Sequence, residues 1–144
     1  MLTRETKRKG YDGGASVVVD KLVFGYNMLA NGVTGGFPYG HPAARSGVMR
    51  ITPTEVHACR TTCGGGFFFE CFISDVSDLI PLVQENDQTL TYVGFSRDEM
   101  KEIGAVLCTK GLRRIVPVGQ ALAFSPLWDG YVLFNELTQR VPIL

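Results

Sequence analysis

The chain has 144 residues, which is the length of one ordinary domain or of a lobe of a larger protein. Hydrophobic residues make up 45% and charged residues 19%, so the composition indicates a globular chain and excludes a disordered one. Fourteen Lys and Arg residues balance fourteen Asp and Glu residues, which leaves no general attraction for nucleic acid or anionic membranes. With no apolar run of roughly 18 residues and no signal-peptide pattern, we expect a cytoplasmic protein with reduced cysteines.

The first part of the chain, residues 1–63, gives weak signals, and we expect it to be a poorly defined N-terminal segment. The β-branched run SVVVD at residues 16–20 predicts a short strand, whereas residues 21–30 fit either its continuation or a helix. Five glycines and two prolines at residues 31–47 predict a long loop. Such a loop is either functional or a linker, and the residues favour neither interpretation.

The remainder, residues 64–144, alternates between strand and helix patterns. A glycine turn followed by consecutive aromatics at residues 64–73 predicts a strand that is buried on both faces. Residues 74–86 begin with Ser and Asp and continue with apolar side chains at helical spacing, which predicts a helix that Pro81 disturbs. The alternating residues 88–95 predict a second strand.

The clearest helix follows this second strand. Ser96 and Glu99 have the capping-box spacing that is typical of a helix N-terminus. The predicted apolar face of the helix consists of Met100, Ile103, Leu107 and Cys108. Gly111 suits the left-handed conformation that commonly ends a helix, so we expect the helix to close there.

The C-terminal residues complete the alternation. Residues 113–119 predict a third strand, and a last helix is expected to start at Asp129 or Gly130. We expect Asp129 to cap this helix and Trp128, the only tryptophan, to cover its core end. Strands alternating with helices over residues 64–144 predict an α/β fold in which helices cover the strands.

The cysteines are the first candidates for chemistry. His57, Cys59, Cys63 and Cys71 could be written as a zinc set, but their spacing lacks the paired C-x2-C pattern of structural zinc sites. We therefore expect no metal site. A sharper hypothesis makes Cys63 a nucleophile, with His57 as its base and the amides of the following glycines as an oxyanion hole. We prefer to interpret Cys63 as a structural residue beside an ordinary glycine turn, because glycine turns commonly precede strands.

Among the charged residues, Glu70 stands out because it lies in an apolar strand, where burial without a partner would raise the pKa of its carboxyl group. We expect it to point to an edge or a partner. The charged residues of the capped helix are expected to form a solvated face with weak local pairs. They are Arg97, Asp98, Glu99, Lys101 and Glu102. No glycine-rich phosphate loop is present in the sequence, so cofactor-binding residues stay unknown.

Three motifs in the second half allow a comparison with a known family. They are QTLTYVGF at residues 88–95, RIVPVGQALAF at residues 114–124 and WDGYVLFNELTQRV at residues 128–141. In this order and at this spacing, they resemble the C-terminal part of the acyl-CoA reductase family. That family includes the fatty-acyl-CoA reductase subunit of bacterial luminescence and is similar to the aldehyde dehydrogenase superfamily. The resemblance implies that residues 64–144 form part of an aldehyde-dehydrogenase-like catalytic lobe.

The resemblance also implies an activity. In such an enzyme a cysteine thiolate forms a thioester with the acyl group of acyl-CoA or an acyl-protein, and NADPH reduces that thioester to an aldehyde. The family's nucleotide-binding lobe and its catalytic cysteine precede the matching region, so we assign no catalytic residue among Cys59, Cys63, Cys71 and Cys108. We expect the chain to be inactive without N-terminal lobes or a complementary subunit. The alternative is a non-catalytic interaction or regulatory module that keeps the fold of the lobe.

Overall fold

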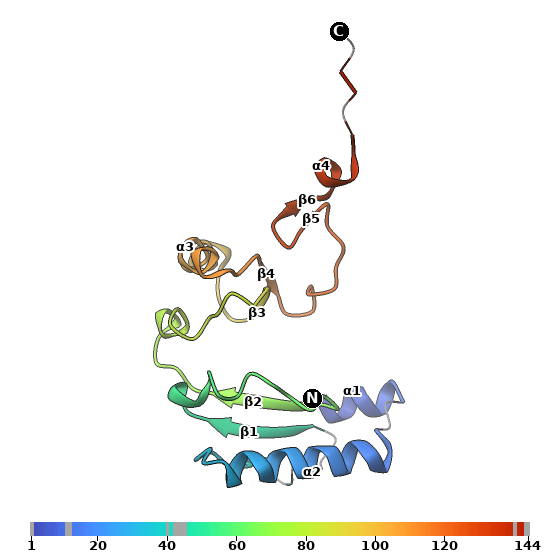
Figure 1. The fold of residues 1–144 in the computed structure, drawn as a ribbon, viewed down its shortest axis with the longest axis vertical. Coiled ribbons are helices and arrows are strands. Elements are labelled where there is room, and N and C mark those ends of the chain that lie inside the picture. The colour runs from blue at the N-terminus through green and yellow to red at the C-terminus, as the bar shows by residue number, and fades with distance from the viewer. Residues whose placement is uncertain (1, 11–12, 40, 42–45, 140, 143–144) are drawn as a thin grey trace. The chain divides into compact units, whose positions relative to one another are not determined.

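The computed structural model describes residues 2–10, 13–39, 41, 46–139 and 141–142. Helices mix with strands that form small two-stranded sheets, which is compatible with the α/β class in general (Figure 1). The chain divides into two compact units, Met1–Ile73 and Ser74–Leu144, and each has its own hydrophobic core. The division follows Ile73, whereas the sequence had suggested a boundary after residue 63, because the strand at residues 67–71 pairs within the first unit.

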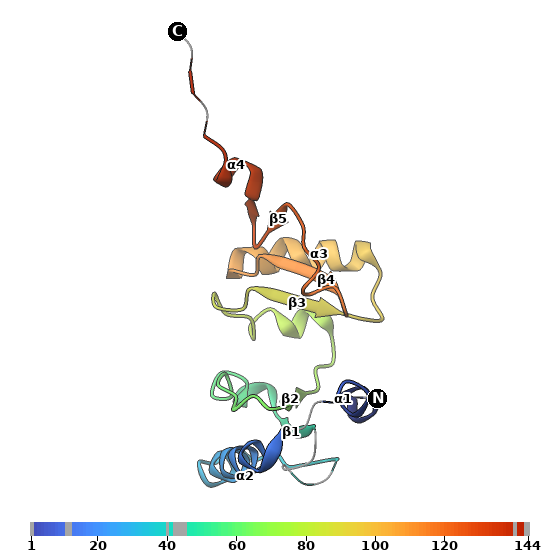
Figure 2. The same cartoon turned by 90° about the vertical axis from the view of Figure 1, so that its right-hand side faces the viewer.

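The first unit is a pair of parallel strands covered by one long helix. Its elements are α1 (Leu2–Arg8), α2 (Gly14–Ala30), β1 (Gly47–Ile51), the short 3-10 helix η1 (Pro53–Glu55) and β2 (Phe67–Cys71). Gly47 lies opposite Phe67 in the sheet, and α2 runs along it (Figures 1 and 2). Phe24 of α2 meets the ring of Phe67 edge to face, with the ring centroids 5.2 Å apart. The core therefore forms between α2 and one face of the sheet.

Helix α2 corrects the first strand prediction. The SVVVD run at residues 16–20 and the ambiguous residues 21–30 belong to the same helix. Phe24, Met28 and Leu29 recur at helical spacing and pack against the buried residues of the sheet. Packing along this side of the helix outweighs the strand preference of the valines, of which Val19 and Val23 are exposed.

The expectation that β2 is buried on both faces is wrong within this unit. Phe67 is 3% exposed, but its neighbour Phe68 is 48% exposed. Successive side chains of a strand point to opposite faces, and α2 covers the face of Phe67 and Phe69 only. Glu70 lies on the same face as Phe68, and it pairs there with Arg50 of β1.

The loop predicted at residues 31–47 is confirmed for its described residues up to 46, but Gly47 already belongs to β1, and residues 40 and 42–45 lie outside the described residues. It is tied to β1 by a bond in which Arg50 N donates to Gly36 O at 2.9 Å. A Cβ at Gly35 would lie 1.5 Å from the carbonyl oxygen of Arg50. Only glycine permits this approach, so one of the loop's glycines has a packing role.

The second unit repeats the parallel pair with different elements. They are the 3-10 helix η2 (Val76–Leu79), β3 (Thr89–Tyr92), α3 (Arg97–Leu107), the 3-10 helix η3 (Cys108–Lys110), β4 (Arg114–Pro117), β5 (Leu127–Trp128), β6 (Tyr131–Val132) and α4 (Leu133–Leu137). Strand β3 pairs with β4 in parallel, with Thr89 opposite Arg114, and α3 lies along the pair (Figure 2). Met100, Ile103, Leu107 and Leu112 form the buried core.

Both predicted ends of the capped helix are confirmed. Ser96 Oγ accepts a hydrogen bond from Glu99 N, and Glu99 Oε2 accepts one from Ser96 N at 2.7 Å. At the other end η3 continues α3 by one tight turn, and Gly111 follows with a left-handed φ of 103°. Cys108 was predicted on the apolar face but is exposed, because α3 ends at Leu107 and the turn then tightens.

The helix predicted at residues 74–86 is reduced to η2. Asp75 caps it as expected, accepting from Ser77 N at 2.8 Å. Pro81 lies two residues after the end of η2 and lacks the N–H group that would continue a helix, so the apolar residues pack without a longer helix. Val76, Leu79, Ile80 and Val83 all contact the core of the second unit.

The prediction of a helix from Asp129 or Gly130 is also wrong. Asp129 has φ 48° and Gly130 has φ 85°, and the two residues join β5 and β6 in a tight hairpin. An Asp-Gly pair suits a two-residue hairpin turn because both positions need a positive φ. Asp129 therefore turns the chain rather than capping a helix, and α4 begins later, at Leu133.

Candidate functional site

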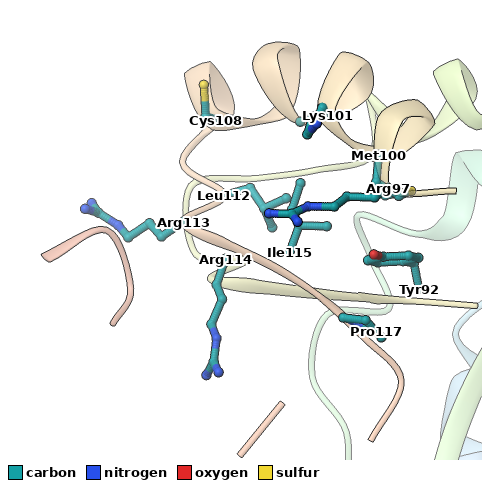
Figure 3. A pocket seen from close by; sticks show the side chains of 11 residues that line it. Tyr92, Arg97, Met100, Lys101, Cys108, Leu112, Arg113, Arg114, Ile115 and Pro117 are labelled. Atoms are coloured by element: carbon teal, nitrogen blue, oxygen red, sulfur yellow. The ribbon is translucent and has the colours of Figure 1, made fainter. Parts of the chain in front are cut away.

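An open groove of about 630 Å³ lies on the second unit, between α3 and the strands β3 and β4 (Figure 3). Its apolar lining includes Met100, Leu112, Ile115 and Pro117. Helix α3 comes close to the sheet here, because a Cβ at Gly104 would lie 2.9 Å from Ile115 Cδ1. The groove therefore depends on a glycine in the middle of a helix, where glycine is otherwise unfavourable.

The charged lining of the groove is entirely cationic. Arg97 and Lys101 come from α3, while Arg113 precedes β4 and Arg114 is its first residue. Among the described residues that line the groove, none is a carboxylic acid. Arg97 extends across the front of the groove in Figure 3. The neutral composition of the chain thus hides a local excess of positive charge.

Two of these cations are engaged outside the groove. Lys101 Nζ lies 2.7 Å from Asp98 Oδ1 in an exposed pair within α3, which confirms the predicted weak local pairing. Arg113 lies over the ring of Tyr131, with its Cζ 5.9 Å from the ring centroid. Neither contact buries its charge, and Figure 3 shows the Arg113 side chain extending away from Arg97 and the groove.

Arg114 has a structural role instead. Its guanidinium donates to the carbonyl oxygens of Ala121 at 2.8 Å, Ala123 at 2.6 Å and Gln120 at 3.3 Å. The same group lies 4.3 Å from the centroid of the Trp128 ring, in a cation–π contact. A guanidinium has enough donors to do this, whereas lysine has no planar fork. Arg114 therefore joins β4, the following turn and the hairpin.

The stack continues beyond the tryptophan. Phe124 lies nearly parallel to Trp128, with ring centroids 6.2 Å apart and an interplanar angle of 25°. The lone tryptophan is thus held by the aromatic ring of Phe124 and the cation of Arg114. This assigns Trp128 to anchoring the hairpin, not to covering the end of a helix.

The structure argues against a nucleophilic Cys63. Burial raises the pKa of the thiols of Cys59, Cys63 and Cys71, all of which pack in or against the core of the first unit. A raised pKa keeps a thiol protonated and unreactive at neutral pH. The proposed oxyanion hole is compromised too, because Gly64 N donates to Thr62 Oγ1 at 3.3 Å.

The other candidates of the sequence have simpler places. His57 is exposed, and among the described residues no group of three His, Cys, Asp or Glu side chains could hold a metal ion. Glu70 has the partner that was expected: Arg50 Nη2 and Nε donate to its Oε2 at 2.8 and 3.0 Å. Tyr39 Oη donates to the other oxygen at 3.2 Å. Glu70 is therefore one half of a cross-strand ion pair.

Glu55, a carboxylate that the sequence did not single out, accepts four hydrogen bonds. Thr52 and Thr34 each donate two hydrogen bonds to Glu55, from the backbone N and from Oγ1, at 2.6–2.9 Å. These bonds, that from Thr52 N first, lower the pKa of Glu55 to about 2. Glu55 fastens the loop at Thr34 to the residues after β1. The TPTE sequence at residues 52–55 has capping-box spacing and could have revealed it.

Sequence reasoning placed Arg97 and Lys101 on a solvated face and missed that they border a groove. A signal was available, because the two residues are four apart on α3 and therefore lie on the same side of it. What the sequence could not give was the partner surface, the Arg113–Arg114 pair that starts β4. Among the helices in the described ranges, none has the length and apolar character to cross a membrane.

The chain matches no family model, no curated protein and no solved structure among those compared.

Proposed function

We propose that the chain forms the C-terminal part of a long-chain acyl-CoA reductase, which reduces an acyl thioester to an aldehyde with NADPH. The supporting observation is that the three motifs which carry the resemblance build one connected structure. Strand β3 lies in the first motif and pairs with β4, which lies in the second. Arg114, the first residue of the second motif, holds Trp128, the first residue of the third.

All three motifs thus contribute to the packing of the same structural unit. A parallel strand pair with a crossover helix needs its two strands in a fixed order, and the hairpin needs its anchor at a fixed distance beyond the second strand. The order and spacing that resemble the reductases are therefore those that this packing requires. The aldehyde-dehydrogenase-like lobe is accordingly part of the proposal.

The remainder of the activity is proposed to come from residues outside the lobe. NADPH would supply the hydride that, with loss of the thiolate, turns the thioester into an aldehyde. The raised pKa of Cys59, Cys63 and Cys71 supports leaving the acyl-accepting cysteine to another part of the enzyme. Cys108 Sγ donates to Ala105 O at 3.1 Å, so this thiol has a local partner in its own helix turn. We expect the chain alone to form no aldehyde from NADPH and a long-chain acyl-CoA.

A chimaera tests the proposal directly. Residues 74–144 would replace the corresponding C-terminal segment of a bacterial luminescence reductase, and NADPH-dependent aldehyde formation from a long-chain acyl-CoA would be measured. We expect activity within about tenfold of the parent enzyme, because a lobe that packs correctly shifts the barrier by little more than about 1.4 kcal/mol.

The matched controls are two single substitutions in the chimaera. Arg114→Ala removes the anchor of the hairpin and should lower the activity, while Lys110→Gln changes an exposed cation of η3 and should not. A chimaera that folds, as judged by circular dichroism, but yields no aldehyde would contradict the proposal.

One observation favours the alternative, a non-catalytic interaction or regulatory module. The C-terminal residues expose a run of large apolar side chains, of which Leu122 is 91% and Leu137 is 81% exposed. Others are Val118, Phe124, Leu127 and Phe134. Exposed apolar groups in such number are typical of a surface that meets another protein. A chain that binds an intact reductase and changes its rate, but cannot replace its C-terminal segment, would establish this alternative.

A further inference from the structure

Helix α2 of the first unit carries a second apolar face, which lies away from the sheet. The charged residues of α2 are Asp20 and Lys21, and Lys21 is 3% exposed. Phe24 and Met28 pack against the core of the sheet, and Figure 1 shows β1 and β2 on one side of the helix. The other side leaves large apolar side chains between 38% and 55% exposed, namely Val18, Val19, Val23 and Tyr26. A helix that is apolar on nearly every side is normally buried on every side, so this face indicates a docking surface.

We propose that this face pairs with α2 of a second copy of the chain, with the two helices antiparallel about a two-fold axis beside Val23. Val19, Val23 and Tyr26 recur at positions i, i+4 and i+7, which is the spacing of a seam between two packed helices. A two-fold axis brings the same surface of both copies together, so a continuous apolar seam is complementary to itself. The inference goes beyond the proposed function and does not depend on it.

The residues beside the seam select the antiparallel orientation. At about 3.6 residues per turn, Asp20 and Asn27 border the seam on one flank, and Val18 and Leu22 border it on the other. An antiparallel pair places each flank against the same flank of the second copy. Asp20 and Asn27 lie on opposite sides of Val23 along the helix, so the Asp20 carboxylate can accept a hydrogen bond from the amide of Asn27 of the second copy, and symmetry repeats the contact. A parallel pair would instead press Asp20 against the apolar flank and bury its charge without a partner.

The charges of α2 also argue against a lipid surface as the occupant. Asp20 is exposed, and anionic headgroups would repel it. The cation Lys21 is buried toward the glycine turn, because a Cβ at Gly65 would lie 3.8 Å from Lys21 Cδ. An apolar face bordered by a carboxylate and an amide therefore fits a copy of itself better than a membrane.

Tyr26 is the anchor of the proposed interface, and its exposed area sets the expected affinity. Its ring meets Phe37 edge to face, with the centroids 6.5 Å apart, so it is held in place before association. Fixed tyrosine rings commonly contribute much of the binding energy of an interface. The exposed apolar side chains offer roughly 400 Å² per copy, about half of the roughly 800 Å² that each partner buries in a standard interface. We therefore expect a reversible dimer with a dissociation constant on the order of 10 μM.

Sedimentation equilibrium of the full chain tests the inference. A reducing agent keeps the exposed Cys108 from forming cross-links. We expect the average mass to rise from one copy toward two copies between about 1 and 200 μM chain. A mass of one copy throughout this range would overturn the inference, whatever else α2 binds. Growth beyond two copies would contradict a closed two-fold pair.

Substitution locates the interface on α2. Val23→Glu places a carboxylate at the centre of the seam in both copies and should weaken the dimer at least about tenfold. Leu122→Glu, at a 91% exposed residue of the second unit, is the matched control and should change the dissociation constant by less than about twofold. Circular dichroism checks that both variants remain folded. A dimer that survives Val23→Glu but not Leu122→Glu would assign the association to the second unit and overturn the inference.

A charge exchange at Asn27, an exposed helix position, tests the orientation. Asn27→Lys faces Asp20 of the second copy and should tighten the dimer about threefold to tenfold, whereas Asn27→Asp sets two carboxylates against each other and should weaken it by a similar factor. In an Asp20→Asn background the two variants should bind alike, because the charge that distinguishes them is gone. Equal effects of the two variants on the otherwise unchanged chain would contradict the antiparallel pair.

The result is separable from the proposed function, because the chimaera takes residues 74–144 and lacks α2. An active chimaera together with a monomeric full chain would retain the reductase proposal and reject the helix pair. A dimeric full chain whose chimaera is folded but inactive would retain the helix pair and reject the reductase.

Discussion

The two units of the chain have the same plan but are held together by different chemistry. Each is a pair of parallel strands packed against one helix. In the first unit a cluster of aromatic rings, with Phe24, Phe67 and Phe69 in mutual contact, packs with the buried Met49 and Ile51, and ionised groups fasten the edges. In the second unit the core is aliphatic, and close approach at glycines brings helix and loops onto the strands.

The comparison shows that one arrangement of strands and helix can be sensitive to two kinds of change, a change of pH and an increase in side-chain volume. A unit fastened by a hydrogen-bonded carboxylate and a cross-strand ion pair should respond to pH. A unit that relies on close contact at Gly104 and Gly111 should respond to added volume. The units differ in degree and not in kind, because a Cβ at Gly35 of the first unit would lie 1.5 Å from Arg50 O, and hydrogen bonds also lower the pKa of Asp75 and Glu99 in the second.

The largest effect is expected from Phe67→Ala in the first unit. The ring is 3% exposed and contacts three other phenylalanines, so its removal should cost about 3–5 kcal/mol of unfolding free energy. Amide hydrogen exchange should show the loss in α2 and β1 while protection of α3 persists. Phe68→Ala, at a neighbouring exposed ring, is the control and should cost far less; equal losses would refute an aromatic core on one face only.

Leu107→Ala is the counterpart in the second unit. Leu107 is fully buried, and the cavity left behind should cost about 2–5 kcal/mol. Exchange should rise in α3 and β4 and stay unchanged in α2. Val106→Ala serves as the control, since Val106 is 42% exposed. If protection fell equally in both units, the two cores would not be independent.

Gly111→Ala should have an intermediate effect. The residue has φ 103°, and a Cβ there would lie 2.6 Å from Glu85 Cα. Strain in this conformation costs about 1–3 kcal/mol, and the clash with backbone adds to it. Gly94→Ala separates the two causes, because Gly94 has φ 85° but open space around its Cβ position. Urea unfolding of both variants would show the contribution of packing as their difference, and identical losses would mean that packing contributes nothing.

Arg114→Lys tests the anchor of the hairpin. Lysine keeps the charge but loses the planar fork, so we expect a local loss of about 1–2 kcal/mol from the bonds to Ala121 and Ala123. Exchange should quicken at residues 120–132 and stay slow in α3. The nearby Arg113→Lys should have a smaller effect, since Arg113 makes only a distant contact with Tyr131. A larger effect at Arg113 would contradict the role given to Arg114.

The smallest effect is expected from the pH dependence of Glu55. Its pKa of about 2 in the folded chain lies below the ordinary value of roughly 4.3. The stability that it contributes is thus fully present above the ordinary pKa and is lost as the pH falls from there through about 2. Glu55→Gln should flatten the melting temperature of the first unit over this window, with Glu102→Gln as the control. An unchanged acid profile would argue against the bonds from Thr34 and Thr52.

The second unit could be predicted more fully from the sequence, because its signals are local. The box at Ser96 and Glu99 and the cap at Gly111 fixed both ends of one helix within a turn. The hairpin at Asp129 was missed although its Asp-Gly signal is equally local, since the apolar spacing behind it favoured a helix. In the first unit, helix α2 has a valine run at its start and owes its stability to contacts with β2, which no local pattern contains.

The groove, too, could be predicted only in part from the sequence. Arg97 and Lys101 could be placed on one side of a helix from their spacing, and Arg113 and Arg114 at the head of a strand. That these two sets border one groove follows from the crossover of α3 between the parallel strands β3 and β4, and from the small side chain of Gly104. Nor does the RR pair reveal that Arg114 bonds to carbonyl groups while Arg113 lies over Tyr131.

The parallel register within each unit also has a kinetic consequence. Gly47 pairs with Phe67 and Thr89 with Arg114, so each ladder closes a chain segment of modest length. Closing short loops is entropically cheap, and folding is fast when contacts are local. During synthesis the first ladder can form before the residues of the second have left the ribosome. The chain is thereby suited to fold in the order in which it is translated.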